Sequence, residues 1–213
     1  MRNAFHRLDA AVPDAITAGL YVLAWTVPKL LGVGQVRLLL TAVLVEFLVM
    51  HASAFYGFGI RRRGERPAKR AAILGAITAV YLVPIVLAAV TLKSFSPVIS
   101  FLWLFTCRFA FLWRHPATVE DEMRRMKLLW MVSLASYFLG TIAVTRLPLP
   151  ALGITPDFVA ALSLSGHPNP KAQPPWLALA FGIFYFAVQA ATKFVLAGRE
   201  SAPPPPQAKR AVV

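Results

Sequence analysis

Long apolar runs alternate with short polar segments along the chain, and this pattern predicts an all-α membrane protein. Six runs approach the length of about 20 apolar residues that a helix needs to cross a bilayer core of about 30 Å. They cover residues 12–31, 36–59, 71–92, 97–113, 128–145 and 176–197. Barrel strands would alternate polar and apolar residues, which these runs do not. We therefore predict a polytopic integral membrane protein with six transmembrane helices in a compact bundle.

The polar segments complete a prediction of one membrane domain, residues 1–198, followed by a tail. Residues 146–175 form the longest outer loop, in which Thr155 followed by Pro156 is typical of a helix start. We expect a short helix there, over about 156–165. Residues 199–213 hold four consecutive prolines and no apolar periodicity, which predicts a disordered, cytoplasmic tail.

Lysine and arginine predict the orientation, because cytoplasmic loops are enriched in them. With the N-terminus inside, both large basic clusters and the C-terminal tail lie in the cytoplasm. The opposite side then receives only Lys29, Arg37, Lys93, Arg146 and Lys171. We expect a bacterial cytoplasmic (inner) membrane protein with both termini in the cytoplasm.

Composition supports this class and excludes others. The chain is 58% hydrophobic and only 15% charged, far from the balance of a soluble enzyme domain. Its net charge of +13 lies in clusters between apolar runs, which indicates membrane topology and no nucleic-acid partner. Cys107 is the only cysteine, so neither an internal disulfide nor a structural zinc site is expected, and no cofactor is predicted.

Glu46 is the most informative position, because it lies within an apolar run. A carboxylate in the hydrocarbon core costs several kcal/mol unless it is protonated or paired, so Glu46 should face the bundle interior. Two interpretations are open: a proton or cation site, or a buried polar clamp between helices.

Three further residues are candidates for the same polar core. Arg108 lies at a depth similar to that of Glu46, roughly 15 to 17 Å below the outer end of its span, and either pairs with Glu46 or extends to the cytoplasmic interface. Ser53 returns to within about 20° of Glu46 around the helix, whereas His51 points about 140° away. His51 is interpreted as a hydrogen-bonded packing residue, since a haem would need a second membrane histidine at matching depth.

Charged residues near span ends are assigned to the lipid interface. The cytoplasmic cluster of basic residues fixes topology and is a candidate contact for anionic headgroups; it comprises Arg61, Arg62, Arg63, Arg66, Lys69 and Arg70. Asp14, Lys29, Arg37 and Lys193 are expected at the interface as well, where long side chains reach water at low cost.

The first two predicted spans resemble the opening helix pair of an uncharacterised bacterial multi-pass membrane family, a domain of unknown function. The features in common are Trp25, the turn at 32–34 and the leucines at 38–40 that lead to Glu46. In that family an aromatic pair precedes the acidic residue and Asn follows it, whereas here Phe47 follows Glu46. The resemblance implies a membrane fold and no activity.

No nucleotide-binding loop, zinc-protease motif, nucleophile elbow or CxxC motif occurs in the chain. We therefore expect a non-enzymatic accessory or scaffold component in the lipid bilayer, with an unknown membrane protein or a second copy as its partner. The alternative is a small permease or ion-coupled carrier that uses Glu46.

Overall fold

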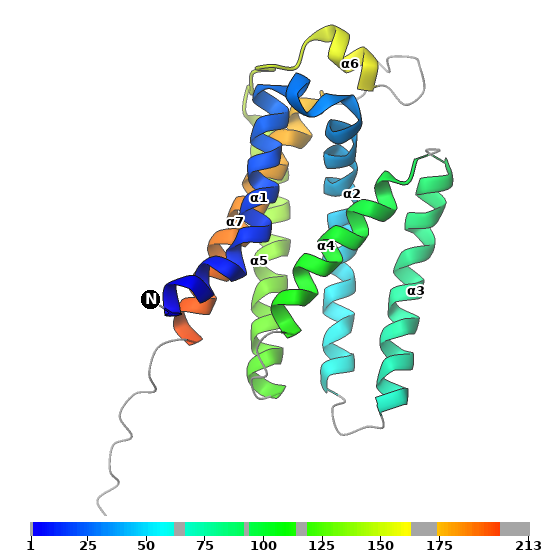
Figure 1. Cartoon of the computed structure of the whole chain (residues 1–213), viewed down its shortest axis with the longest axis vertical. Helices are drawn as coiled ribbons and strands as arrows, with labels where there is room; N and C mark the ends of the chain where they lie inside the picture. The colour runs from blue at the N-terminus through cyan, green and yellow to red at the C-terminus, as the bar shows by residue number, and fades with distance from the viewer. Residues whose placement is uncertain (1, 62–66, 92–93, 114–118, 163–173, 201–213) are drawn as a thin grey trace, which may run out of the picture.

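The computed structural model describes residues 2–61, 67–91, 94–113, 119–162 and 174–200. Its described residues form helices and no strand, which confirms the all-α prediction. The helices, labelled in Figure 1, are α1 (Arg2–Thr26), α2 (Pro28–Arg61), α3 (Pro67–Thr91), α4 (Ser96–Trp113), α5 (Val119–Arg146), α6 (Pro156–Leu162) and α7 (Pro175–Glu200).

A sharp corner joins α1 to α2. The first predicted span extends to residue 31, but α1 ends at Thr26 because Pro28 has no N–H to donate and disfavours helical backbone at the residue before it. α2 then breaks at Gly32, whose φ of 77° is accessible mainly to glycine. The segments on either side of Val27 bend by 120°, so α2 descends beside α1.

The loop before α6 holds this corner in place. The Trp25 indole N–H donates to the Pro150 carbonyl at 3.0 Å, and the Gly153 N–H donates to the Trp25 carbonyl at 3.0 Å. A side chain at Gly153 would lie 2.1 Å from the Thr26 carbonyl oxygen, so only glycine fits there. α6 follows, with the Phe158 N–H donating to the Thr155 hydroxyl at 3.3 Å.

The long helices pack around a shared core. α1 lies along α7, and α5 packs against α7 on another side, while α2 contacts α4, α5 and α1. α3 packs against α2 and α4, away from α7 (Figure 1). Leu39, Ile85, Phe101, Leu179 and Phe186 belong to the buried core.

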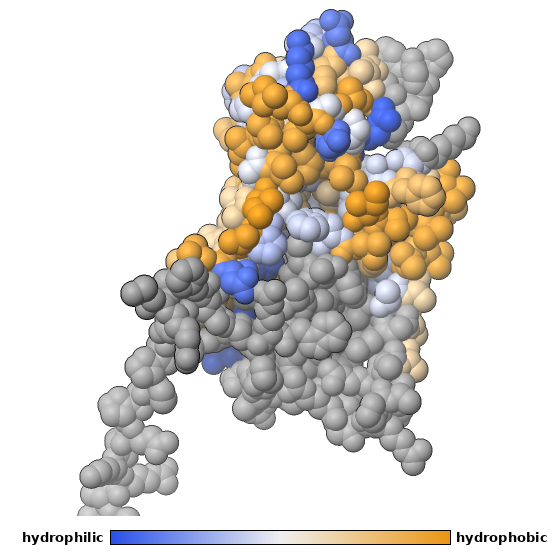
Figure 2. Space-filling view, in the orientation of Figure 1, coloured by the Kyte–Doolittle hydropathy of each residue, from blue (hydrophilic) through white to orange (hydrophobic). Residues whose placement is uncertain are grey.

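Apolar side chains also cover much of the described outer surface. In Figure 2 they form much of the coloured part of the visible face, while hydrophilic residues gather at the end that carries α6 and in a smaller patch beside the grey atoms. Two helical segments are long and apolar enough to cross a membrane, Arg124–Arg146 and Pro175–Gly198. The bent pair Leu8–Thr26 and Pro28–Val43 makes a third if the pair is counted as one span. These segments, found among the described residues, support a membrane protein; the number six stays a prediction.

Candidate functional site: a polar layer inside the helix bundle

Glu46 lies in the interior of the bundle, where its side chain accepts a hydrogen bond from α7. Glu46 is 2% exposed, and the hydroxyl of the fully buried Tyr185 donates to its Oε1 at 2.7 Å. This hydrogen bond offsets part of the free-energy cost of removing the carboxylate from water. The contact joins α2 to α7 through residues far apart in the sequence.

Asp14 and Lys193 form an ion pair between α1 and α7. Lys193 Nζ lies 2.5 Å from Asp14 Oδ2, and the two residues are 5% and 6% exposed, respectively. The prediction that both lie at the lipid interface is therefore wrong. The prediction placed Asp14 close to the start of the apolar run 12–31, but α1 begins at Arg2, about three turns before Asp14.

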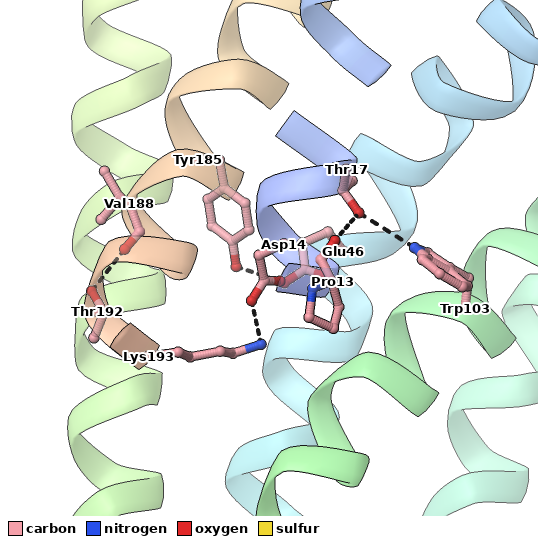
Figure 3. A network of polar contacts seen from close by, with 9 residues as sticks. All are labelled: Pro13, Asp14, Thr17, Glu46, Trp103, Tyr185, Val188, Thr192 and Lys193. Atoms are coloured by element: carbon pink, nitrogen blue, oxygen red, sulfur yellow. Dashed lines mark hydrogen bonds and ion pairs between the residues drawn. The ribbon is translucent and has the colours of Figure 1, made fainter. Parts of the chain in front are cut away.

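These two pairs point into the same space between α1, α2 and α7, as Figure 3 shows. We call Asp14, Glu46, Tyr185 and Lys193 the polar layer. Charges removed from water are costly, and each here has a partner on another helix. The layer therefore specifies how the three helices fit together.

A second set of contacts links α4 to α1 beside the ion pair. The Thr17 hydroxyl donates to the Pro13 carbonyl at 2.8 Å, and the Trp103 indole N–H donates to Thr17 Oγ1 at 3.4 Å (Figure 3). Pro13 lies inside α1 without breaking it. The Thr17 hydroxyl therefore connects the turn of α1 that carries Asp14 to Trp103 of α4.

Aromatic packing holds Tyr185 in position. Its ring lies edge-on to Phe186, with centroids 5.2 Å apart, and stacks with Phe181 at 5.8 Å. Tyr137 of α5 meets the Tyr185 ring edge-on at 6.3 Å. With two χ angles and a packed ring, Tyr185 presents its hydroxyl to Glu46 at a small entropic cost.

Gly182 allows α1 to approach α7 just above the polar layer. The Tyr21 ring lies against Gly182, where a Cβ atom would come within 2.4 Å of the ring. The Tyr21 hydroxyl donates to the Leu39 carbonyl of α2 at 2.5 Å. Tyr21 therefore connects α1 to α2, and its ring fits against α7 because residue 182 is glycine.

The other predicted site residues are placed only in part. His51 and Ser53 belong to α2 and Arg108 to α4, but their side chains lie outside the described part of the structure, as do those of Arg61, Lys69 and Arg70. Arg62, Arg63 and Arg66 fall outside the described residues. The pairing of Glu46 with Arg108 stays a prediction.

The sequence contained a signal for the α7 side of the layer that we did not use. Tyr185, Gln189 and Lys193 recur every four residues in a largely apolar segment, so they follow one face of a helix. All three are buried. A polar stripe on a membrane-length helix is expected to face other helices and not lipid.

The described residues contain no cluster of three or more His, Cys, Asp or Glu side chains that suits a metal ion. The comparisons with known proteins give no further guide: no protein-family model, curated protein or solved structure matches the chain. The resemblance of the first two spans to an uncharacterised family stays a prediction.

Proposed function

We propose that the chain is a non-enzymatic accessory or scaffold component of a bacterial cytoplasmic membrane, with six spans and both termini in the cytoplasm. The observation that supports this most is the burial of Glu46 against Tyr185, together with the ion pair between Asp14 and Lys193. Each contact joins two helices and occupies polar groups that a solute would otherwise bind. In this proposal, the polar layer keeps the helix bundle rigid, and a membrane partner recognises the shape of the bundle.

Replacing Glu46 tests this role. Glu46→Gln keeps the shape of the side chain and removes its charge, so a structural role predicts reduced accumulation in the membrane and a lower unfolding temperature in detergent. The matched control is Thr141→Val, which removes a polar group whose only described bond is to its own helix and which faces outward. Normal accumulation of Glu46→Gln with an unchanged unfolding temperature would contradict the scaffold role.

A partner is the second requirement of this proposal. Purification of the intact chain in mild detergent, followed by mass measurement of the complex, is expected to recover a stoichiometric membrane protein or a second copy. A monodisperse monomer from its native membrane would count against an accessory subunit.

The second candidate is an ion-coupled carrier, favoured by one specific observation. Asp14, Glu46 and Lys193 bring three ionisable groups together inside the bundle, and such groups in membrane proteins mark proton or ion pathways. The carrier predicts that Glu46→Gln accumulates normally and loses flux of a proton or solute across reconstituted vesicles. If vesicles that contain the unaltered protein show no more flux than empty vesicles, the carrier function is excluded.

Orientation is tested by labelling two positions. In a Cys107→Ala background, Asn169→Cys is expected to react with an impermeant maleimide applied outside the cell, whereas Gly64→Cys reacts only after the membrane is opened. The reverse pattern would overturn the proposed topology.

A further inference from the structure

Two buried polar side chains are not used by the contacts described above. Ser133 of α5 is 0% exposed and Gln189 of α7 is 2% exposed. Among the described contacts, neither the Ser133 hydroxyl nor the Gln189 side-chain N–H group has a hydrogen-bond partner in the protein. A buried donor or hydroxyl without a partner costs about 1 to 3 kcal/mol, so native interiors rarely leave one unsatisfied.

Helix register places these two side chains at the same level. α5 and α7 run antiparallel, because Gly140 lies against Phe181 and Phe184 while Tyr137 meets Tyr185. Ser133 is one turn before Tyr137 on α5, and Gln189 is one turn after Tyr185 on α7. Residues four apart share a helix face. Ser133 and Gln189 therefore form the next level of the α5–α7 contact.

The same position lies between the two pairs of the polar layer. Gln189 follows Tyr185 by one helical turn, about 6 Å along the axis, and precedes Lys193 by another. Tyr185 bonds Glu46 and Lys193 pairs with Asp14. On α7, Gln189 thus lies between two side chains of the polar layer, one helical turn from each.

We propose that Ser133 and Gln189 bind one buried water molecule between α5 and α7. The Gln189 N–H group needs an acceptor, which disfavours a cation. Glu46 and Asp14, the partners of Tyr185 and Lys193 one helical turn away on α7, disfavour an anion. A small neutral molecule that both donates and accepts satisfies both side chains, and water is the smallest of these. The site is independent of whether the chain is a scaffold or a carrier.

A double-mutant cycle tests the site. Ser133→Ala and Gln189→Met each remove one water ligand while keeping similar volume, and each is expected to lower the unfolding temperature in detergent. Because both single changes release the same water, the double variant should unfold within about one degree of the less stable single variant. Ser136→Ala is the control, since Ser136 bonds the Val132 carbonyl of its own helix at 2.7 Å; combined with Gln189→Met, its effect should add.

Two results would overturn the proposal. Additive effects of Ser133→Ala and Gln189→Met would show that nothing couples the two side chains. A higher unfolding temperature for Gln189→Met alone would show a dry site in which the amide is only a cost.

A structural measurement covers the case in which these variants do not fold. An experimental density map of the unaltered protein that shows ordered solvent should contain a peak within hydrogen-bond distance of both Ser133 Oγ and Gln189 Nε2. Direct contact between the two side chains, or apolar atoms filling the space, would contradict the site.

Discussion

α7 and α3 bury very different surfaces. α7 turns Tyr185, Gln189 and Lys193 toward its neighbours, and at least two of these contact a specific atom on another helix. α3 buries Ile85 and Ala89, while Val83 and Leu87 face outward. Polar contacts need defined partners and distances, whereas aliphatic contacts tolerate small shifts. The α1–α2–α7 contact is therefore specified by individual polar pairs, whereas the buried side chains described on α3, Ile85 and Ala89, are aliphatic.

Removing one member of the ion pair is expected to cause the largest loss of stability. Lys193→Met leaves the buried Asp14 carboxylate without its ammonium partner, and losing one member of a buried pair costs about 3 to 5 kcal/mol. Denaturant unfolding in detergent measures the loss. Lys29→Met, at an exposed position, is the control and should change stability by less than about 0.5 kcal/mol.

Overpacking at Gly182 is the next largest effect. Gly182→Ala places a methyl group against the Tyr21 ring and is expected to cost about 1 to 3 kcal/mol. Gly19→Ala is the matched control, since no atom beyond the neighbouring backbone of its own helix lies within 4 Å of the added Cβ, and alanine favours helix over glycine by about 1 kcal/mol. Opposite signs for the two changes are expected in thermal unfolding; equal signs would contradict the close contact of α1 with α7.

Removing the Tyr185 hydroxyl probes the polar layer more gently. Tyr185→Phe keeps the ring packing and takes one donor from Glu46, so a loss of about 1 to 3 kcal/mol is expected. Glu46→Leu removes the acceptor of this bond, and combined with Tyr185→Phe it should cost less than the sum of the two single changes, because both remove the same hydrogen bond. Strict additivity would argue that the bond contributes nothing.

A change on α3 should have the smallest effect. Val83 is exposed in the bundle, and a membrane would surround it with lipid as apolar as valine itself. Val83→Ala is expected to change the unfolding free energy by less than about 0.5 kcal/mol. A loss as large as that of Tyr185→Phe would show that α3 has a protein partner on this face.

The sequence alone predicted the helical class, since the long apolar runs admit no barrel alternation. The cost of a carboxylate in hydrocarbon also led to the expectation of an inward-facing Glu46, and the structure places Glu46 in the interior. Its bond to Tyr185 was not predicted, because partners far apart in the chain depend on how the helices pack. Asp14 and Lys193 were misplaced, since hydropathy located the ends of apolar runs and not the ends of the helices.

The polar layer itself is tested most directly by exchanging its two charges. Asp14→Lys and Lys193→Asp each place like charges side by side and should abolish accumulation of the protein. The double variant restores an opposite pair, so accumulation and unfolding temperature should recover most of the way to the unaltered protein. A double variant no better than the worse single variant would contradict the contact between α1 and α7 on which this account depends.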